Sequence, residues 1–200
     1  MNRRDRVLHA AAIKRHAPPA AIAALAGVPL AEAQAELDAA VATGRAIEAR
    51  GAYALTPLAG VALQARYAHQ FADLRDDAGF RGAYDGFERI NTTLKQIVTD
   101  WQTLDVGGKK VANDHSDKAH DEGVIDRLGG LHEQAEPILA KLAQGLPRLK
   151  YYGDKLLSAL ESAEDGDHDW VSDIRRDSYH TVWFELHEEL LRIMGREREE

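Results

Sequence analysis

Between residues 82 and 104 the apolar side chains recur at the three- and four-residue spacing of one helix face. This spacing predicts a long amphipathic helix from about Gly82 to Leu104, which ends before Gly107-Gly108. One face of such a helix must be buried against another element. The stripe consists of Tyr84, Phe87, Ile90, Leu94, Ile97, Val98 and Trp101.

The rest of the C-terminal part also has a helical pattern. We expect a second helix from about Asp117 to Leu128, extending to Ala143 if Gly129-Gly130 and Pro137 do not interrupt it. A third follows Pro147, residues 164–169 form a loop, and the last helix runs from Trp170 or Asp177 to Met194. No strand pattern is recognised after residue 60. An antiparallel helical bundle is the simplest architecture for these elements.

The first 60 residues follow a different order. Helices are expected from Arg6 to about His16, from Ala20 to Ala26 and from Pro29 to about Thr43, separated by Pro18-Pro19 and Gly27. Two β-type runs follow, Arg45–Ala49 and Ala52–Thr56, with Arg50-Gly51 as the turn. The predicted fold is mainly α: a winged helix-turn-helix of three helices and a β-hairpin, followed by the bundle. The run Tyr53–Gly60 resembles the second wing strand of MarR-like regulators.

Charge and aromatic content divide the chain at the same place. Residues 1–70 carry a net charge of +3 and residues 71–200 a net charge of −11. Eleven of the thirteen aromatic residues lie in the second part. We therefore expect a winged-helix domain over residues 1–70 and a helical bundle over residues 71–200.

A winged helix usually suggests DNA binding, but the third helix disfavours it. This helix enters the major groove in such proteins and must face phosphates and base edges. Here it contains Glu32, Glu36 and Asp38 and no Lys or Arg, and Gln34 alone is a typical base reader. Phosphate neutralisation supplies most non-specific affinity. DNA binding stays open through wing arginines such as Arg45 and Arg50, and protein docking is the alternative.

Several functional classes are excluded by what the sequence lacks. Without cysteine there are no disulfides, thiolate metal sites or cysteine nucleophiles. No apolar run approaches the ~18 residues of a membrane span, and the first residues do not form a signal peptide, so we expect a cytoplasmic protein without a membrane partner. The absence of phosphate-binding glycine motifs predicts that the chain alone binds no ATP or dinucleotide.

The last helix carries the most prominent candidates for chemistry. His180 and His187 lie seven residues apart on the same side, beside the aromatic residues Trp183 and Phe184. One interpretation is that they are core histidines, hydrogen-bonded to their neighbours. The other is a pocket in which one of them accepts a proton from a bound hydroxyl group.

Two further segments carry polar candidates. Residues 113–122 include His115 and a helix cap at Ser116 or Asp117, and they either begin a helix or line a pocket mouth. Arg148 and Lys150, next to Tyr152, offer a cation and an aromatic surface to an anionic group. Di-iron bundles use Glu-x-x-His pairs, which this chain lacks, and its Asp-x-x-His spacings fall at helix ends or loops. We therefore expect no metal site.

Three strings together resemble a known module: residues 113–117, residues 146–152 and above all residues 177–188. They are similar to the C-terminal module that follows the swivelling phosphohistidine domain in some phosphoenolpyruvate-synthase or pyruvate-phosphate-dikinase-like proteins. There too the module follows a winged-helix-like segment. The resemblance covers most of residues 1–195. On this resemblance we expect the chain to carry the module without the ATP-grasp and swivelling domains.

The resemblance implies a small subunit of a split phosphotransferase, catalytically incomplete alone. In that family ATP phosphorylates a histidine on the mobile domain, which passes the phosphoryl group to an acceptor. ATP and Mg²⁺ would be held by the partner, an ATP-grasp/phosphohistidine subunit, and this chain would hold no cofactor. It would bind a hydroxylated, phenolic acceptor, as in the catabolism of aromatic compounds.

In this interpretation His180 or His187 would orient or deprotonate the acceptor. The acceptor site would be lined by His115, Arg148, Lys150, Tyr152, Tyr179, Trp183 and Phe184. The alternative is a MarR- or PadR-like transcription regulator in which the bundle senses a ligand or forms the dimer interface.

Overall fold

The computed structural model describes residues 1–197, and most of them are helical. The chain forms two compact units. One, the N-terminal unit, contains Met1–Asp77 and residues 187–197. The other, the central unit, contains Ala78–Leu186. The mainly α fold expected from the sequence is confirmed.

Three helices and a β-hairpin begin the N-terminal unit. They are α1 (Arg3–Lys14), α2 (Pro19–Ala26), α3 (Leu30–Ala42), β1 (Ala46–Ala49) and β2 (Ala52–Leu55). Helices α4 (Pro57–Gln70) and α5 (Ala72–Asp76) follow. Among the described residues no single helix is long and apolar enough to span a membrane. Helices α2 and α3 reach the required length and hydropathy only when they are counted together, and the pair is bent by 111°.

Local sequence explains where these elements begin and end. The Asn2 side chain accepts a hydrogen bond from Asp5 N and starts α1, and Thr56 does the same for α4 through Ala59 N. Helix α2 ends at Gly27 with a φ of 62°, a conformation that glycine adopts without strain. Strands β1 and β2 pair antiparallel, with Ala46 opposite Leu55, and the turn falls at Arg50-Gly51 as expected.

A buried polar network lies within the apolar core of the N-terminal unit. His9 Nδ1 lies 2.7 Å from the Tyr67 hydroxyl, and His9 Nε2 lies 3.3 Å from Glu189 Oε1. The carboxylate of Asp5 accepts hydrogen bonds from Arg66 and Gln70. The same unit has a core of buried apolar residues, among them Val7, Ile22, Leu25, Leu37, Leu63 and Phe71. Because buried polar groups are costly unless paired, this network fixes how α1, α4 and the chain end pack.

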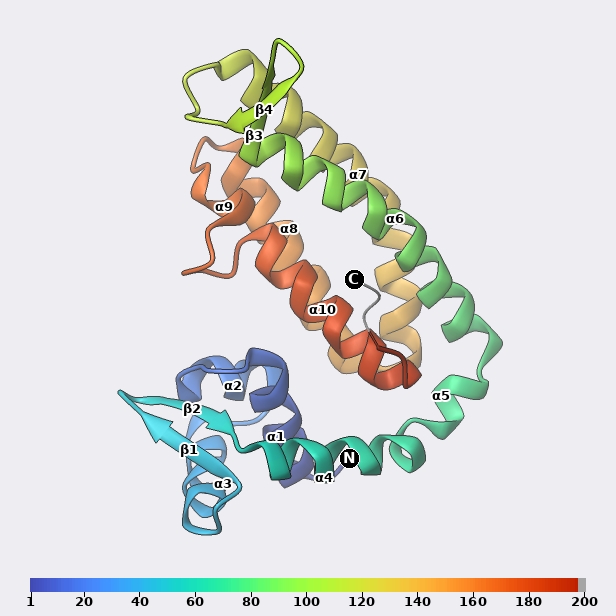
Figure 1. Ribbon diagram of the computed structural model, residues 1–200. Coiled ribbons are helices and arrows are strands. Elements are labelled where there is room, and N and C mark those ends of the chain that lie inside the picture. Colours follow the sequence, from blue (N-terminus) through green and yellow to red (C-terminus); the bar gives the residue numbers. More distant parts are fainter. Residues whose placement is uncertain (198–200) are drawn as a thin grey trace. The chain divides into compact units, whose positions relative to one another are not determined.

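The central unit is built on two long helices that run side by side, α6 (Ala78–Gln102) and α7 (Lys118–Gly145) (Figure 1). Gly86 allows their close approach, since a Cβ there would lie 3.3 Å from Ile138 Cδ1. Helices α8 (Lys150–Glu164), α9 (Asp169–Ser172) and α10 (Tyr179–Met194) follow a short 3-10 turn, Pro147–Leu149. The first half of α10, through Leu186, belongs to this unit.

A second β-hairpin corrects the expectation that no strands follow residue 60. Helix α6 ends at Gln102, and β3 (Thr103–Val106) pairs antiparallel with β4 (Lys109–Ala112). The two glycines, which the sequence predicts to follow the end of a helix, form the turn, with φ values of 63° at Gly107 and 81° at Gly108. Two adjacent residues with positive φ form the turn type that best matches the twist of paired strands.

Helix α7 continues through both glycines and Pro137 to Gly145. A proline inside a helix removes one hydrogen bond and costs about 3 kcal/mol. Burial compensates for this cost, because apolar side chains are buried along the whole helix. They are Val124, Ile125, Leu128, Leu131, Ala135, Leu139 and Leu142. At the start of α7, Asp117 is the N-cap and accepts a hydrogen bond from His120 N.

Candidate functional site

A cavity of about 350 Å³ opens between the C-terminal half of α7 and the start of α8. Its apolar wall is formed by Leu139, Ala140, Ala143, Leu149, Gly153 and Leu157. The polar groups are His132 and Glu136 on α7 and Lys150 and Asp154 on α8. We call this space the α7–α8 cavity. A mostly apolar cavity with a few convergent polar groups is typical of a site for a small molecule.

His132 is the buried polar group of this cavity. Only 5% of the residue is exposed, and its Nδ1 lies 3.1 Å from the Tyr179 hydroxyl. Burial lowers the pKa of the imidazole, although the carboxylates of Glu136, Glu164 and Glu161 act in the opposite direction. The ring is therefore neutral at pH 7, and a neutral imidazole is able to accept a proton.

The tyrosine that contacts His132, Tyr179, is part of an aromatic stack. Tyr179 is fully buried, and burial raises the pKa of its hydroxyl. Its ring stacks on that of Trp183 with a centroid distance of 5.9 Å, and Trp183 stacks on Phe87 at 4.7 Å. The indole Nε1 of Trp183 donates to Asn91 Oδ1 at 3.0 Å. These contacts hold Tyr179, and through it His132, in a fixed position.

Three residues proposed from the sequence, Arg148, Lys150 and Tyr152, lie at or just before the start of α8 and differ in their exposure. Lys150 lines the cavity with a side chain that is 72% exposed, and its Nζ lies 2.7 Å from Asp154 Oδ2. Tyr152 is fully buried, and its ring meets that of Tyr151 edge-on at 5.4 Å. Arg148 is half-buried. Lys150 is thus the cation that the structure places in the cavity wall.

The two histidines first proposed as catalytic fall into different compact units. His180 is half-buried in the central unit, and burial lowers the pKa of its imidazole. His187 is buried and belongs to the N-terminal unit. Phe184 is half-buried. Among the described residues, those that line the α7–α8 cavity do not include His180, His187 or Phe184.

His115 lies in a separate polar cluster after the β3–β4 hairpin. Its Nδ1 lies 3.0 Å from Oδ2 of Asp121, and the other carboxylate oxygen accepts a hydrogen bond from Asn113 Nδ2. Asp121 is 1% exposed and the His115 side chain 41%. The His115 ring packs on Trp101 with a centroid distance of 4.6 Å. A buried carboxylate thus orients a partly exposed imidazole, which is a structural precondition for proton transfer.

Two of these groups were missed from the sequence, and one had a signal. His132 continues the apolar stripe of α7, where Leu128, Leu131 and Ala135 flank it. A histidine inside such a stripe must be buried, and this would have identified it. Asp121 gave no such signal, since it follows a helix cap among other acidic residues.

Within residues 1–197 no group of three or more His, Asp or Glu side chains is placed to hold a metal ion.

Buried His132 and half-buried His180 in the central unit predict that stability falls on acidification. The folded-state pKa of His132 and that of His180 lie below the ordinary value of about 6.5. Between these values and 6.5 the unfolded chain binds more protons than the folded chain, so the free energy of unfolding decreases as pH falls through this window. The urea midpoint should drop between pH 7.5 and 5.5, and it should drop less in a variant carrying His132→Gln and His180→Gln. An equal drop in both proteins would contradict the assignment.

Comparisons of this chain with models of protein families, with curated proteins and with solved structures gave no match.

Proposed function

We propose that this chain is the acceptor-binding small subunit of a two-component phosphotransferase of the phosphoenolpyruvate-synthase or dikinase type. The α7–α8 cavity holds a hydroxylated aromatic molecule, and His132 accepts the hydroxyl proton. The observation that carries this proposal is a neutral, buried imidazole in the wall of an apolar cavity that also contains Lys150. The resemblance of residues 113–117, 146–152 and 177–188 to the dikinase-type module supports the choice of reaction.

The proposed step moves one phosphoryl group and one proton. The partner subunit, charged by ATP and Mg²⁺, presents a phosphohistidine. The bond between its nitrogen and phosphorus breaks, a bond forms between phosphorus and the acceptor oxygen, and the hydroxyl proton passes to His132. Positioning and charge stabilisation dominate such transfers. Lys150 offsets the negative charge that the phosphoryl group brings to the cavity.

Base function at His132 requires one particular tautomer. The hydrogen must be on Nδ1, which then donates to the Tyr179 oxygen 3.1 Å away. The lone pair of Nε2 is then available to the acceptor hydroxyl. Tyr179 fixes the ring orientation in this arrangement, as a hydrogen-bonded neighbour does for many functional histidines. His180 and His187 serve as structural histidines in this proposal.

The N-terminal unit serves as a docking module for the partner subunit. Its order of three helices and a hairpin supports a winged helix, and Ala17, between α1 and α2, forms a β-bridge with Tyr53. Two observations on α3 argue against DNA binding by this helix. The Gln34 amide donates to Asp38 and to the Tyr53 hydroxyl, and Arg3 pairs with Glu32 and Glu36. These contacts occupy the groups that base and phosphate recognition would need.

Reconstitution tests the proposal. The tagged chain is purified from its host together with the protein that binds it. We expect this partner subunit to contain ATP-grasp and swivelling histidine domains. The two purified proteins together should convert ATP and phenol to phenyl phosphate, followed by ³¹P NMR, and this chain alone should not. A partner that phosphorylates phenol equally fast without this chain would overturn the assignment.

A further inference from the structure

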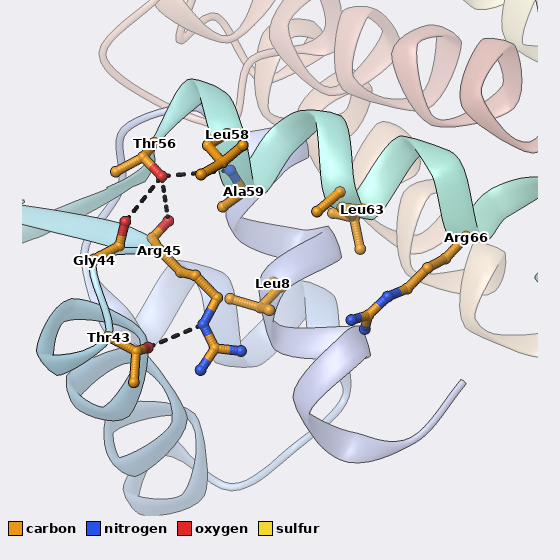
Figure 2. Close-up of a pocket in the computed structure, with 10 residues that line it drawn as sticks. Leu8, Thr43, Gly44, Arg45, Thr56, Leu58, Ala59, Leu63 and Arg66 are labelled. Carbon is orange, nitrogen blue, oxygen red and sulfur yellow. Dashed lines mark hydrogen bonds between the residues drawn. The ribbon is translucent and has the colours of Figure 1, made fainter.

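We propose that the N-terminal unit binds a small carboxylate with an apolar body, at a site distinct from the α7–α8 cavity. The site is a cavity of about 240 Å³ between α1, the turn that joins α3 to β1, and the start of α4 (Figure 2). All of its lining residues lie between residues 8 and 66, so the site belongs to the N-terminal unit alone. This inference does not depend on the proposed phosphotransfer.

The floor of the cavity is apolar, and the charges in its wall are positive. Leu8, Ala59 and Leu63 form the floor and are buried. Figure 2 shows the guanidinium groups of Arg45 and Arg66 on either side of Leu8. An apolar surface between two cations fits a molecule that has an apolar body and an anionic group.

Arg45 is the anchor for the anionic group. Its Nε donates to Thr43 Oγ1 at 2.9 Å, which holds the guanidinium group in place. Among residues 1–197 no carboxylate forms an ion pair with it. Arg66, in contrast, pairs with Asp5 Oδ1 at 2.8 Å, so its charge is partly offset. The terminal nitrogens of Arg45 therefore offer the donor fork that matches the two oxygens of a carboxylate.

The frame around Arg45 is held together by Thr56. Its hydroxyl is within hydrogen-bond distance of the backbone oxygens of Gly44 and Arg45, and it accepts from Ala59 N (Figure 2). The Thr56 amide also donates to Arg45 O at 2.9 Å. These bonds tie the turn before β1 to the start of α4. A binding site framed in this way loses little conformational entropy when a ligand enters.

The size of the cavity limits the body of the ligand. Sites for drug-sized molecules occupy roughly 300–1,000 Å³, so this cavity suits one aromatic ring or a short branched chain. Leu58, which also lines it, is 79% exposed, and a bound apolar body would remove part of that side chain from water.

A titration of the ¹⁵N-labelled full chain with benzoate tests the site by NMR. We expect shifts of the backbone amides of residues 43–45, 56 and 58–66, with a dissociation constant on the order of millimolar for so small a ligand. Benzyl alcohol has the same ring without the charge and should bind at least about tenfold more weakly. Inorganic phosphate, which lacks the apolar body, should cause no comparable shifts.

Two variants and one matched control complete the experiment. Arg45→Gln should weaken benzoate binding by roughly 10- to 100-fold. Leu58→Asp should weaken it through repulsion, and it leaves the fold intact because a carboxylate in the first turn of α4 favours the helix. Arg50→Gln removes the same charge from the β1–β2 turn and should leave binding unchanged.

Three results would overturn the proposal: no shifts with benzoate, equal binding of benzoate by the Arg45→Gln variant, or equal shifts with phosphate. Benzoate shifts confined to residues 132–157 would overturn it as well, and would place carboxylate binding in the α7–α8 cavity.

Discussion

Replacing Trp183 by alanine should lower the free energy of unfolding of the central unit by about 3–5 kcal/mol. The side chain is 2% exposed and lies in the stack between Phe87 and Tyr179. Its removal leaves a cavity, and the buried Asn91 loses the indole as hydrogen-bond donor. Urea unfolding followed by circular dichroism measures the change.

Trp170→Ala is the matched control. Trp170 is half-buried, its indole donates to Asp167, and Arg176 lies over its ring at 5.4 Å. Because both partners are charged side chains in contact with water, we expect a loss under about 1.5 kcal/mol. If Trp183→Ala costs no more than Trp170→Ala, the aromatic stack is not the core of the central unit.

Replacing His132 by glutamine should slow ATP-dependent phosphorylation of phenol by about 10²- to 10⁴-fold in the reconstituted pair of subunits. This is the usual contribution of a positioned general base. Glutamine keeps the polarity of the position but is unable to accept the proton at neutral pH. The initial rate of phenyl phosphate formation, followed by ³¹P NMR, measures the effect, and circular dichroism verifies that the variant is folded.

His120→Gln is the control in the same helix. His120 Nε2 lies 2.8 Å from the carbonyl oxygen of Asp100, and the residue is not among those that line the α7–α8 cavity. We expect a rate within about twofold of the wild type. Equal rates in the His132 and His120 variants would remove His132 from the proposed mechanism. The same assay on His180→Gln tests whether that residue is structural.

The sequence predicts best where one local pattern decides the structure. The stripe from Tyr84 to Trp101 follows the helical period closely, and α6 contains it. The turn at Arg50-Gly51 was likewise predicted, because a Gly between two β-type runs allows positive φ. The same signal at Gly107-Gly108 was interpreted as a helix stop, since the flanking runs are short and β4 is exposed throughout.

Tertiary packing decides the rest. Gly129, Gly130 and Pro137 leave open in the sequence whether the helix is interrupted, and the buried face of α7 keeps it continuous. His132 and Tyr179 are within hydrogen-bond distance although they lie 47 positions apart in the sequence, and no local pattern predicts this contact. The contact between His115 and Asp121 spans six positions but depends on the course of the loop after β4. Candidate residues were thus visible in the sequence, while the pairs they form were not.

The proposed function requires that the α7–α8 cavity binds a hydroxylated aromatic molecule. Gly153 lines this cavity, and a Cβ added there meets no atom within 4 Å. Gly153→Leu therefore fills the cavity without a clash at Cβ and improves helix propensity. Gly123→Leu makes the same change at an exposed position of α7 where the added Cβ also meets nothing.

The most direct measurement is an NMR titration of the ¹⁵N-histidine-labelled chain with phenol. The ring signals of His132 should shift in the wild type and in Gly123→Leu, with a dissociation constant on the order of millimolar. They should not shift in Gly153→Leu. Absence of a shift in the wild type, or an equal shift in Gly153→Leu, would contradict the account.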